Sequence, residues 1–193
     1  MATHVDPPDS DSIYFNDPEN VAEMARLLGQ DHYINFLPAA AWPELMHEFG
    51  RITRPGGTIR LTESEWWYFT NSPALENLNA MIIRALKLQG ESFSQSGRFT
   101  GVLPMLGRFL LDAGCVNINY KSHVIDYSYG AEAHEGFRHD ASIVFKLFQP
   151  FIVRMGVATQ EEVSRLYEQM QFEMEKDDFR ALMLPLTAWG EKS

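Results

Sequence analysis

The segment Arg54-Pro55-Gly56-Gly57 constrains the fold more than any other part of the sequence. Proline has no backbone N–H and glycine readily takes a positive φ, so neither a helix nor a strand continues through such a segment. Before it, apolar residues recur at i, i+3, i+4 and i+7 from Trp42, which predicts an amphipathic helix from Trp42 to about Ile52. After it, residues 58–63 alternate apolar with polar side chains, which predicts a strand. We therefore expect a helix, a tight turn and a strand in this order.

The rest of the chain adds helices and two further extended segments. Asn16 or Asp17 with Pro18 predicts the start of an earlier helix, which Gly29 ends. Ser72 and Pro73 predict the start of a helix that ends before Gly90. A polar loop over 90–101 and a helix around 103–110, stopped by Gly114, follow.

Residues 115–129 read as extended, with Val116, Ile118 and Tyr120 on one face. A helical region over 131–155 is expected to be interrupted at Pro150, and Thr159 with Glu162 forms a capping box for another helix. The last strand is predicted over 179–189, at a sheet edge, because Pro185 cannot donate to a ladder. This order predicts an α/β protein with unusually few strands.

Size and charge limit the domain count and the partners. A chain of 193 residues that is 45% hydrophobic fits one domain, which we place at 14–193, after a disordered acidic arm at 1–13. A net charge of −10 disfavours nucleic acid as a partner, and a single cysteine fits a reducing compartment. The acidic first residues lack the pattern of a secretory signal, and no apolar run reaches the roughly 18 residues of a membrane span. We expect a cytoplasmic protein with no membrane partner.

Several runs occur in a characteristic order. They are Phe36-Leu37-Pro38, Trp42-Pro43-Glu44-Leu45, residues 51–63, Leu106-Gly107-Arg108-Phe109-Leu110 with Asp112-Ala113-Gly114-Cys115, and Leu186-Thr187-Ala188-Trp189-Gly190. Together they resemble the second half of a class I S-adenosylmethionine-dependent methyltransferase. Residues 51–63 are similar to the helix, Pro-Gly-Gly turn and fifth strand of that family, 106–115 to the helix end before its penultimate strand, and 186–190 to its closing antiparallel strand. The resemblance implies a truncated Rossmann-like methyltransferase sheet with flanking helices.

The cofactor-binding half of such an enzyme is not recognisable in this sequence. In the family a glycine-rich turn after the first strand and an acidic residue after the second hold S-adenosylmethionine. The 13 glycines in this chain include no G-x-G, and the nearest run, Gly97 to Gly101, follows a polar loop. Residues 14–36 are also fewer than the roughly 30 that one βαβ unit takes. The simplest account is an internal deletion near Asp31-His32, and we expect weak or no binding of S-adenosylmethionine.

Candidate substrate-pocket residues follow the strand at 58–63. Glu63 and Glu65 end that strand and Trp66, Trp67 and Tyr68 come next, which suits an aromatic wall for an apolar or cationic acceptor. The alternative is that these rings plug the sheet end. His123 suits a general base near neutral pH or a half-buried structural role. His134 and His139 are five residues apart, which does not place two metal ligands on one helical face, so no metal site is predicted.

Two functions from different classes remain. The first is a methyltransferase-family protein whose ancestor methylated a small molecule; no residue is assigned a catalytic role, and whether enzyme activity remains is left open. The second is a non-catalytic interaction protein or inactive remnant. Loss of the early strands would expose apolar surface on the strand at 58–63 and on helices at 21–28 and 42–49, and such patches favour self-association. The second hypothesis therefore predicts a homo-oligomer.

Overall fold

The structure is a computed structural model that describes residues 39–65 and 68–193. The expected helix that ends at Gly29, the arm at 1–13 and the deletion point at Asp31-His32 lie outside these residues. Within the described part, no helix combines the length and the apolar character that crossing a membrane requires. The elements are η1 (Ala39–Ala41), α2 (Trp42–Ile52), β1 (Thr58–Glu63), β2 (Phe69–Thr70), α3 (Pro73–Gln89), η2 (Leu103–Met105), α4 (Leu106–Asp112), β3 (Cys115–Ser122), β4 (Ile125–Asp126), α5 (His134–Arg154), α6 (Gln160–Met174), β5 (Ala181–Met183) and β6 (Leu186–Lys192).

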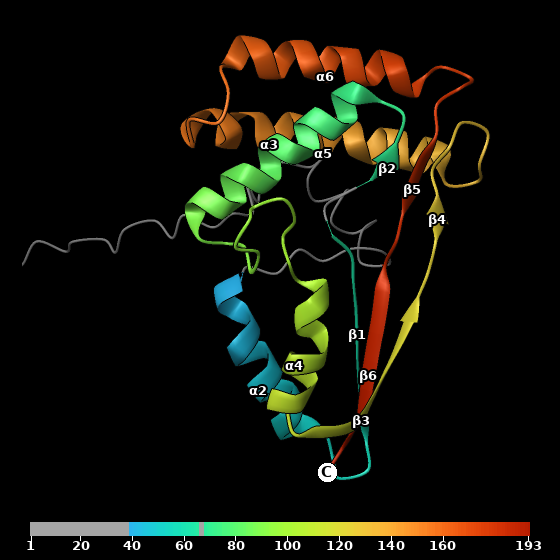
Figure 1. The fold of residues 1–193 in the computed structure, drawn as a ribbon. Coiled ribbons are helices and arrows are strands. Elements are labelled where there is room, and N and C mark those ends of the chain that lie inside the picture. Colours follow the sequence, from blue (N-terminus) through green and yellow to red (C-terminus); the bar gives the residue numbers. More distant parts are fainter. Residues whose placement is uncertain (1–38, 66–67) are drawn as a thin grey trace, which may run out of the picture.

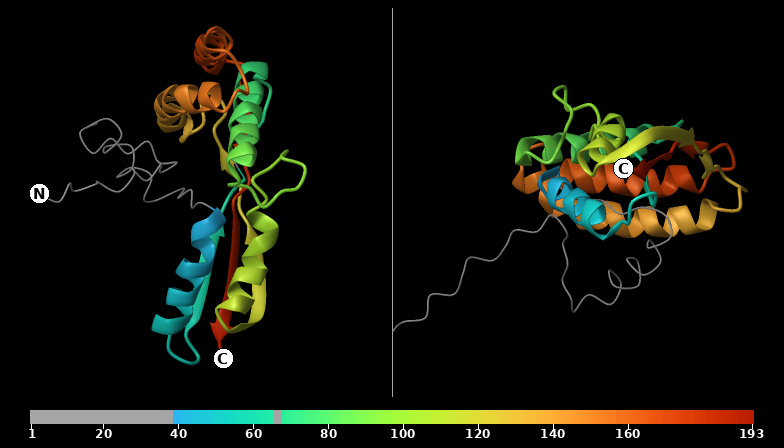
Figure 2. Two further views of the ribbon diagram at one scale, coloured as in Figure 1. Left: turned by 90° about the vertical axis from the view of Figure 1, so that its left-hand side faces the viewer. Right: turned by 90° about the horizontal axis from the view of Figure 1, so that it is seen from below.

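Two three-stranded sheets lie end to end (Figure 1). Their strand orders are β1-β6-β3 and β2-β5-β4, and every paired strand runs antiparallel to its neighbour. Helices α2 and α4 lie beside the first sheet, and α3, α5 and α6 gather around the second (Figures 1 and 2). The predicted α/β class is confirmed.

Helices α2 and α4 cover one face of the β1-β6-β3 sheet. The rings of Trp42 and Phe109 stack with centroids 4.5 Å apart, and Ile59 and Leu61 of β1 are buried in the same cluster. The apolar face of β1 is therefore covered, which corrects the expectation that it is exposed. The polar residues that alternate with them, such as Arg60, are exposed on the opposite face.

The Pro-Gly-Gly segment forms the predicted turn between α2 and β1. Gly56 has φ 74°, a conformation that side chains disfavour, and its N–H donates to the Lys192 carbonyl at 2.8 Å. A Cβ on Gly57 would come within 2.8 Å of the Thr53 side chain. The turn thus needs both glycines, and it ties the start of β1 to the end of β6.

The second core joins α3, α5 and α6 to β5. Helix α3 begins as predicted, because the Ser72 hydroxyl accepts the Leu75 N–H at 3.1 Å. The same hydroxyl donates to the Glu173 carboxylate of α6 at 2.6 Å. Helix α5 continues through Pro150, so the predicted interruption is wrong. The missing hydrogen bond falls on the exposed side, while Phe151 and Ile152, fully buried, hold the last turn in place.

Two predictions for the extended segments are also wrong. Asn117 has φ 54° and the β3–β6 register shifts between Val116 and Asn119. This bulge adds one residue to β3, so Val116 lies on the open face of the sheet, whereas Tyr120 lies over Gly107 of α4 on the other face. The prediction that Val116 and Tyr120 share a face is therefore wrong. The predicted last strand is two strands, β5 and β6, each at the centre of its sheet. Pro185 lies between them, so no ladder needs its missing N–H.

Candidate functional site

A cavity of about 230 Å³ lies where the chain leaves β1 and meets the β2-β5-β4 sheet and α5. Its apolar walls come from Ile125 and Met183 of the sheet and from Ala141 and Val144 of α5. A cavity of about 150 Å³ is known to hold benzene, so this one has room for a somewhat larger molecule. Its size and its largely apolar lining suit a small organic ligand.

Three aromatic rings from separate segments form one wall of this cavity. The rings of Tyr127 and Phe137 stack with centroids 4.4 Å apart, and the Tyr68 ring lies 5.1 Å from Phe137 and 6.2 Å from Tyr127. A fourth ring, Phe145, lines the cavity about two turns further along α5 than Phe137. Aromatic rings bind apolar groups and cations. The wall is therefore of the kind that the sequence analysis predicted after the strand at 58–63.

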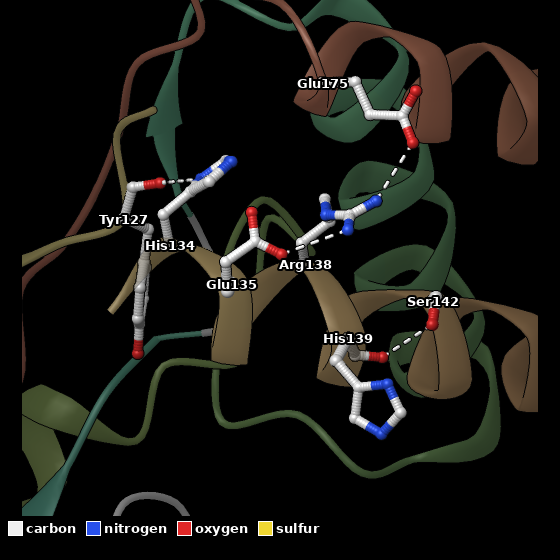
Figure 3. A network of polar contacts seen from close by, with 7 residues as sticks. All are labelled: Tyr127, His134, Glu135, Arg138, His139, Ser142 and Glu175. Carbon is white, nitrogen blue, oxygen red and sulfur yellow. Dashed lines mark hydrogen bonds and ion pairs between the residues drawn. The ribbon is translucent and has the colours of Figure 1, made fainter. Parts of the chain in front are cut away.

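His134 and Arg138, two polar residues of α5, hold the helix to its neighbours, and neither of them lines the cavity. The His134 Nδ1–H donates to the Tyr127 carbonyl at 2.9 Å (Figure 3). Arg138 pairs with Glu135 at 3.0 Å and with Glu175, just after α6, at 2.9 Å. These contacts hold α5 to the segment after β4 and to α6. The ring wall is therefore built on a fixed helix.

Few polar groups reach the cavity, and they differ in burial. Ser64, the first residue after β1, is 5% exposed, and its Oγ is buried without a hydrogen-bond partner in the described structure. Two carboxylates also belong to the lining: Glu132, just before α5, is exposed, and Asp140 on α5 is half-buried. Gly136, which is exposed, lies between them in sequence. A Cβ on Gly136 would meet no atom within 4 Å. Gly136 therefore borders open space at the cavity, and Ser64 is a buried polar member of its lining.

The two predicted carboxylates lie beside the cavity without lining it. Glu65 accepts hydrogen bonds from the Thr100 hydroxyl at 2.5 Å and from the Gly101 N–H at 3.1 Å, so its carboxylate holds the loop after α3. Burial raises the pKa of Glu63 to about 8, although a hydrogen bond from the Ser64 N–H opposes the shift. Trp66 and Trp67 lie outside the described residues, and Tyr68 does line the cavity.

His123 is placed away from this cavity, on the open face of the β1-β6-β3 sheet. Its Nε2 lies 2.9 Å from the Thr187 hydroxyl, which lies 2.9 Å from that of Thr62. A shallow concavity of about 310 Å³ on this face also includes Arg60 and Lys121. The structure does not bring His123 together with Ser64 or Tyr68 in one site.

The described residues contain no group of three or more histidine, cysteine, aspartate or glutamate side chains that could hold a metal ion. His134 is buried and bonded to a backbone carbonyl, and His139 points in another direction from the same helix (Figure 3). Neither histidine therefore takes part in a metal site within the described structure.

The described residues do not fit S-adenosylmethionine in the way that the resemblance implies. A glycine-rich cradle needs backbone that a ligand can approach. Gly101 fails this test, because a Cβ there would lie 2.7 Å from the Ser94 backbone N, and Gly97 packs on Lys87. The loop over 97–101 is thus filled by the chain itself, and it offers the cofactor no open backbone turn.

Comparisons with known proteins do not identify a function for this chain. No protein-family model matches the sequence. No curated protein matches it at a significant level. The candidate function therefore rests on the residues of the cavity and on the resemblance of the ordered runs.

Sequence reasoning missed most residues of the cavity. Phe137, Ala141 and Val144 have the i, i+4, i+7 spacing of one helical face, which could have identified α5 as a lining element. No comparable signal marks Ser64 or Tyr127. Each becomes part of the site only because the chain brings separate segments together.

Proposed function

We propose that this chain is a methyltransferase-family protein that keeps the acceptor-binding half of its ancestor and binds a small molecule in the cavity beside α5. The observation that carries the proposal is the cavity at the end of β1, whose lining combines the buried Ser64 with the rings of Tyr68, Tyr127 and Phe137. In the doubly wound sheets of the family that the sequence resembles, ligands bind beyond the carboxyl ends of the strands, and Ser64 follows the carboxyl end of β1.

The strand arrangement supports the family assignment. The resemblance implies that the strands at β1, β3 and the C-terminal end share one sheet and that the last runs antiparallel. In the structure β6 pairs antiparallel with both β1 and β3, so these two strands run in the same direction. Helices α2 and α4 precede β1 and β3, in the order in which the resemblance places them.

The chemistry that these residues supply is binding and orientation. The rings of Tyr68, Tyr127 and Phe137 enclose an apolar group and exclude water from it. Ser64 and the half-buried Asp140 are the polar residues of the lining that would orient the bound molecule. An ancestral methyl transfer to a small molecule would use the same two functions, because such transfers depend on positioning the acceptor.

Ligand-observed NMR with benzyl alcohol tests the proposal. Gly136→Leu places a side chain in the open space at the cavity entrance, and Gly136→Ala adds only a methyl group at the same position. Both changes suit a helix better than glycine does. We expect saturation transfer to benzyl alcohol with the wild type and Gly136→Ala, and its loss with Gly136→Leu. Equal transfer in all three proteins would mean that the cavity is not the binding site.

A second candidate is an interaction protein that pairs with another chain. Strand β1 is at the edge of its sheet, and among the described residues no strand pairs with its outer side. An unpaired edge presents backbone donors and acceptors to a partner strand. This candidate needs no ligand in the cavity, so the NMR experiment separates it from the first.

A further inference from the structure

We propose that the shallow concavity on the open face of the β1-β6-β3 sheet binds the phosphate group of a small phosphate ester. This inference goes beyond the proposed function, because the concavity shares no lining residue with the cavity beside α5. The register of the sheet, the charge of its open face and a buried hydroxyl network support it.

The register of the three strands brings two basic side chains to one place. Arg60 of β1 pairs with Trp189 of β6, and Lys121 of β3 pairs with Thr187, two residues away on the same strand. Because alternate residues of a strand share a face, these four side chains lie on one side of the sheet. Two strand spacings, about 10 Å, separate β1 from β3, so the long side chains of Arg60 and Lys121 can both contact one group held over β6.

The lining of the concavity is basic although the chain is acidic. It consists of Thr58, Arg60, Lys121, His123, Thr187 and Trp189. The chain carries a net charge of −10, yet none of these residues is an aspartate or a glutamate. Arg60 and Lys121 are exposed, and neither forms an ion pair with another described residue. Their charges therefore favour an anion in the concavity.

One acidic residue lies on the same face at its far end. Glu191 pairs with Thr58 of β1 and with Val116 of β3, beyond Trp189, and it does not line the concavity. Its charge opposes that of the basic side chains, so its neutralisation should strengthen the binding of an anion. The face thus allows a test in which one variant gains affinity.

A hydrogen-bonded floor underlies the concavity. Thr187 is 3% exposed, and its hydroxyl lies 2.9 Å from His123 Nε2 and 2.9 Å from the hydroxyl of Thr62. These contacts link all three strands or their ends at this face. An anion that binds here does not have to order the floor, which lowers the entropic cost of binding.

A phosphate ester suits this arrangement better than a singly charged anion. At neutral pH a phosphate monoester carries nearly two negative charges and three acceptor oxygens. Guanidinium and ammonium groups donate charge-assisted hydrogen bonds to such oxygens, and two cations match the charge of the ester. Trp189 is half-buried and lines the concavity, so it supplies apolar surface for the organic part of the ester.

Amide NMR of the full chain tests the proposal with phenyl phosphate, and benzenesulfonate is the comparison because it has a similar shape and one negative charge. We expect phenyl phosphate to bind at millimolar concentration, to shift the resonances of Arg60, Lys121 and Thr187, and to bind severalfold more tightly than benzenesulfonate. Gly136→Leu, at the other cavity, should leave this binding unchanged, so the result does not depend on the proposed function. Absence of phenyl phosphate binding, or equal affinity for benzenesulfonate, would overturn the proposal.

Charge variants locate the site. Arg60→Gln and Lys121→Gln should each weaken phenyl phosphate binding about fivefold, because each removes a hydrogen bond between charged groups that solvent partly screens. Arg84→Gln on α3 and Lys146→Gln on α5 remove the same charge elsewhere and are the matched controls, and Glu191→Gln should strengthen binding. All five positions are exposed, so the variants should fold. Equal weakening by the control variants would mean that phenyl phosphate responds to the overall charge and that the assigned site is wrong.

Discussion

The carboxylate of Glu65 accepts a hydrogen bond from the hydroxyl of Thr100 at 2.5 Å, and this contact joins the end of β1 to the loop between α3 and α4. Glu65 also accepts the N–H of Gly101, whose φ of 76° and close packing leave the loop few alternatives. The residue that the sequence placed in a substrate pocket thus has a defined structural partner.

Glu65→Ala should lower the free energy of unfolding by about 1–3 kcal/mol, because it leaves buried donors of the loop without an acceptor. Thr100→Val removes the shortest of these contacts, and the double variant should show a smaller loss than the sum of the two. Urea unfolding measures each free energy, with exposed Glu76→Ala as the control. Unchanged stability together with lost benzyl alcohol binding would assign Glu65 to the ligand instead.

Glu63 predicts a pH dependence of stability. Burial raises its pKa to about 8 in the folded protein, from 4.5 when solvated. The folded state therefore binds more protons between these values, and its stability falls as pH rises through this interval. Glu63→Gln removes the titration, so it should match the wild type near pH 4 and exceed its stability above pH 8.

The size of the Glu63 effect follows from the shift in pKa. One unit corresponds to about 1.4 kcal/mol, and because the side chain keeps some contact with solvent we expect on the order of 2–4 kcal/mol at high pH. Thermal unfolding between pH 4 and 9 measures it, with Glu44→Gln on the exposed side of α2 as the control. Parallel stability curves for Glu63→Gln and the wild type would contradict the shifted pKa.

The full chain should bind S-adenosylmethionine weakly or not at all. The loop that most nearly resembles a cofactor turn is packed by its own side chains and backbone. Isothermal titration should give no heat of binding at micromolar protein concentration. A dissociation constant in the micromolar range would show that other residues of the chain form the cofactor site.

The chain should form dimers or larger species in solution. The apolar face of β1 is covered by α2 and α4, so the outer edge of β1, rather than an exposed apolar face, is the surface that supports this prediction. Sedimentation at micromolar concentration should show a species heavier than 22.1 kDa. A single monomeric species that unfolds in one sharp transition and binds no hydrophobic dye would contradict it.

Local signals in the sequence determined the elements whose boundaries depend on neighbouring residues. The Pro-Gly-Gly turn, the helix Trp42–Ile52, the strand Thr58–Glu63 and the cap at Ser72 agree with the structure, because backbone sterics and short-range hydrogen bonds decide them. Pro150 and Pro185 misled the prediction, since their effects depend on what surrounds them. One lies on the exposed side of a well-anchored helix, and the other lies between two strands.

The candidate site could be predicted only in part. The sequence pointed to the end of β1, to aromatic rings and to carboxylates, and the cavity contains all three. It did not identify which residues supply them, because Ser64, Tyr127 and Phe137 are distant in the chain and each has an ordinary role within its own segment. The composition of the chain determined that it folds around apolar cores. Tertiary packing alone decided that three rings and Ser64 line one cavity, because contacts between distant segments depend on how whole helices and strands fit together.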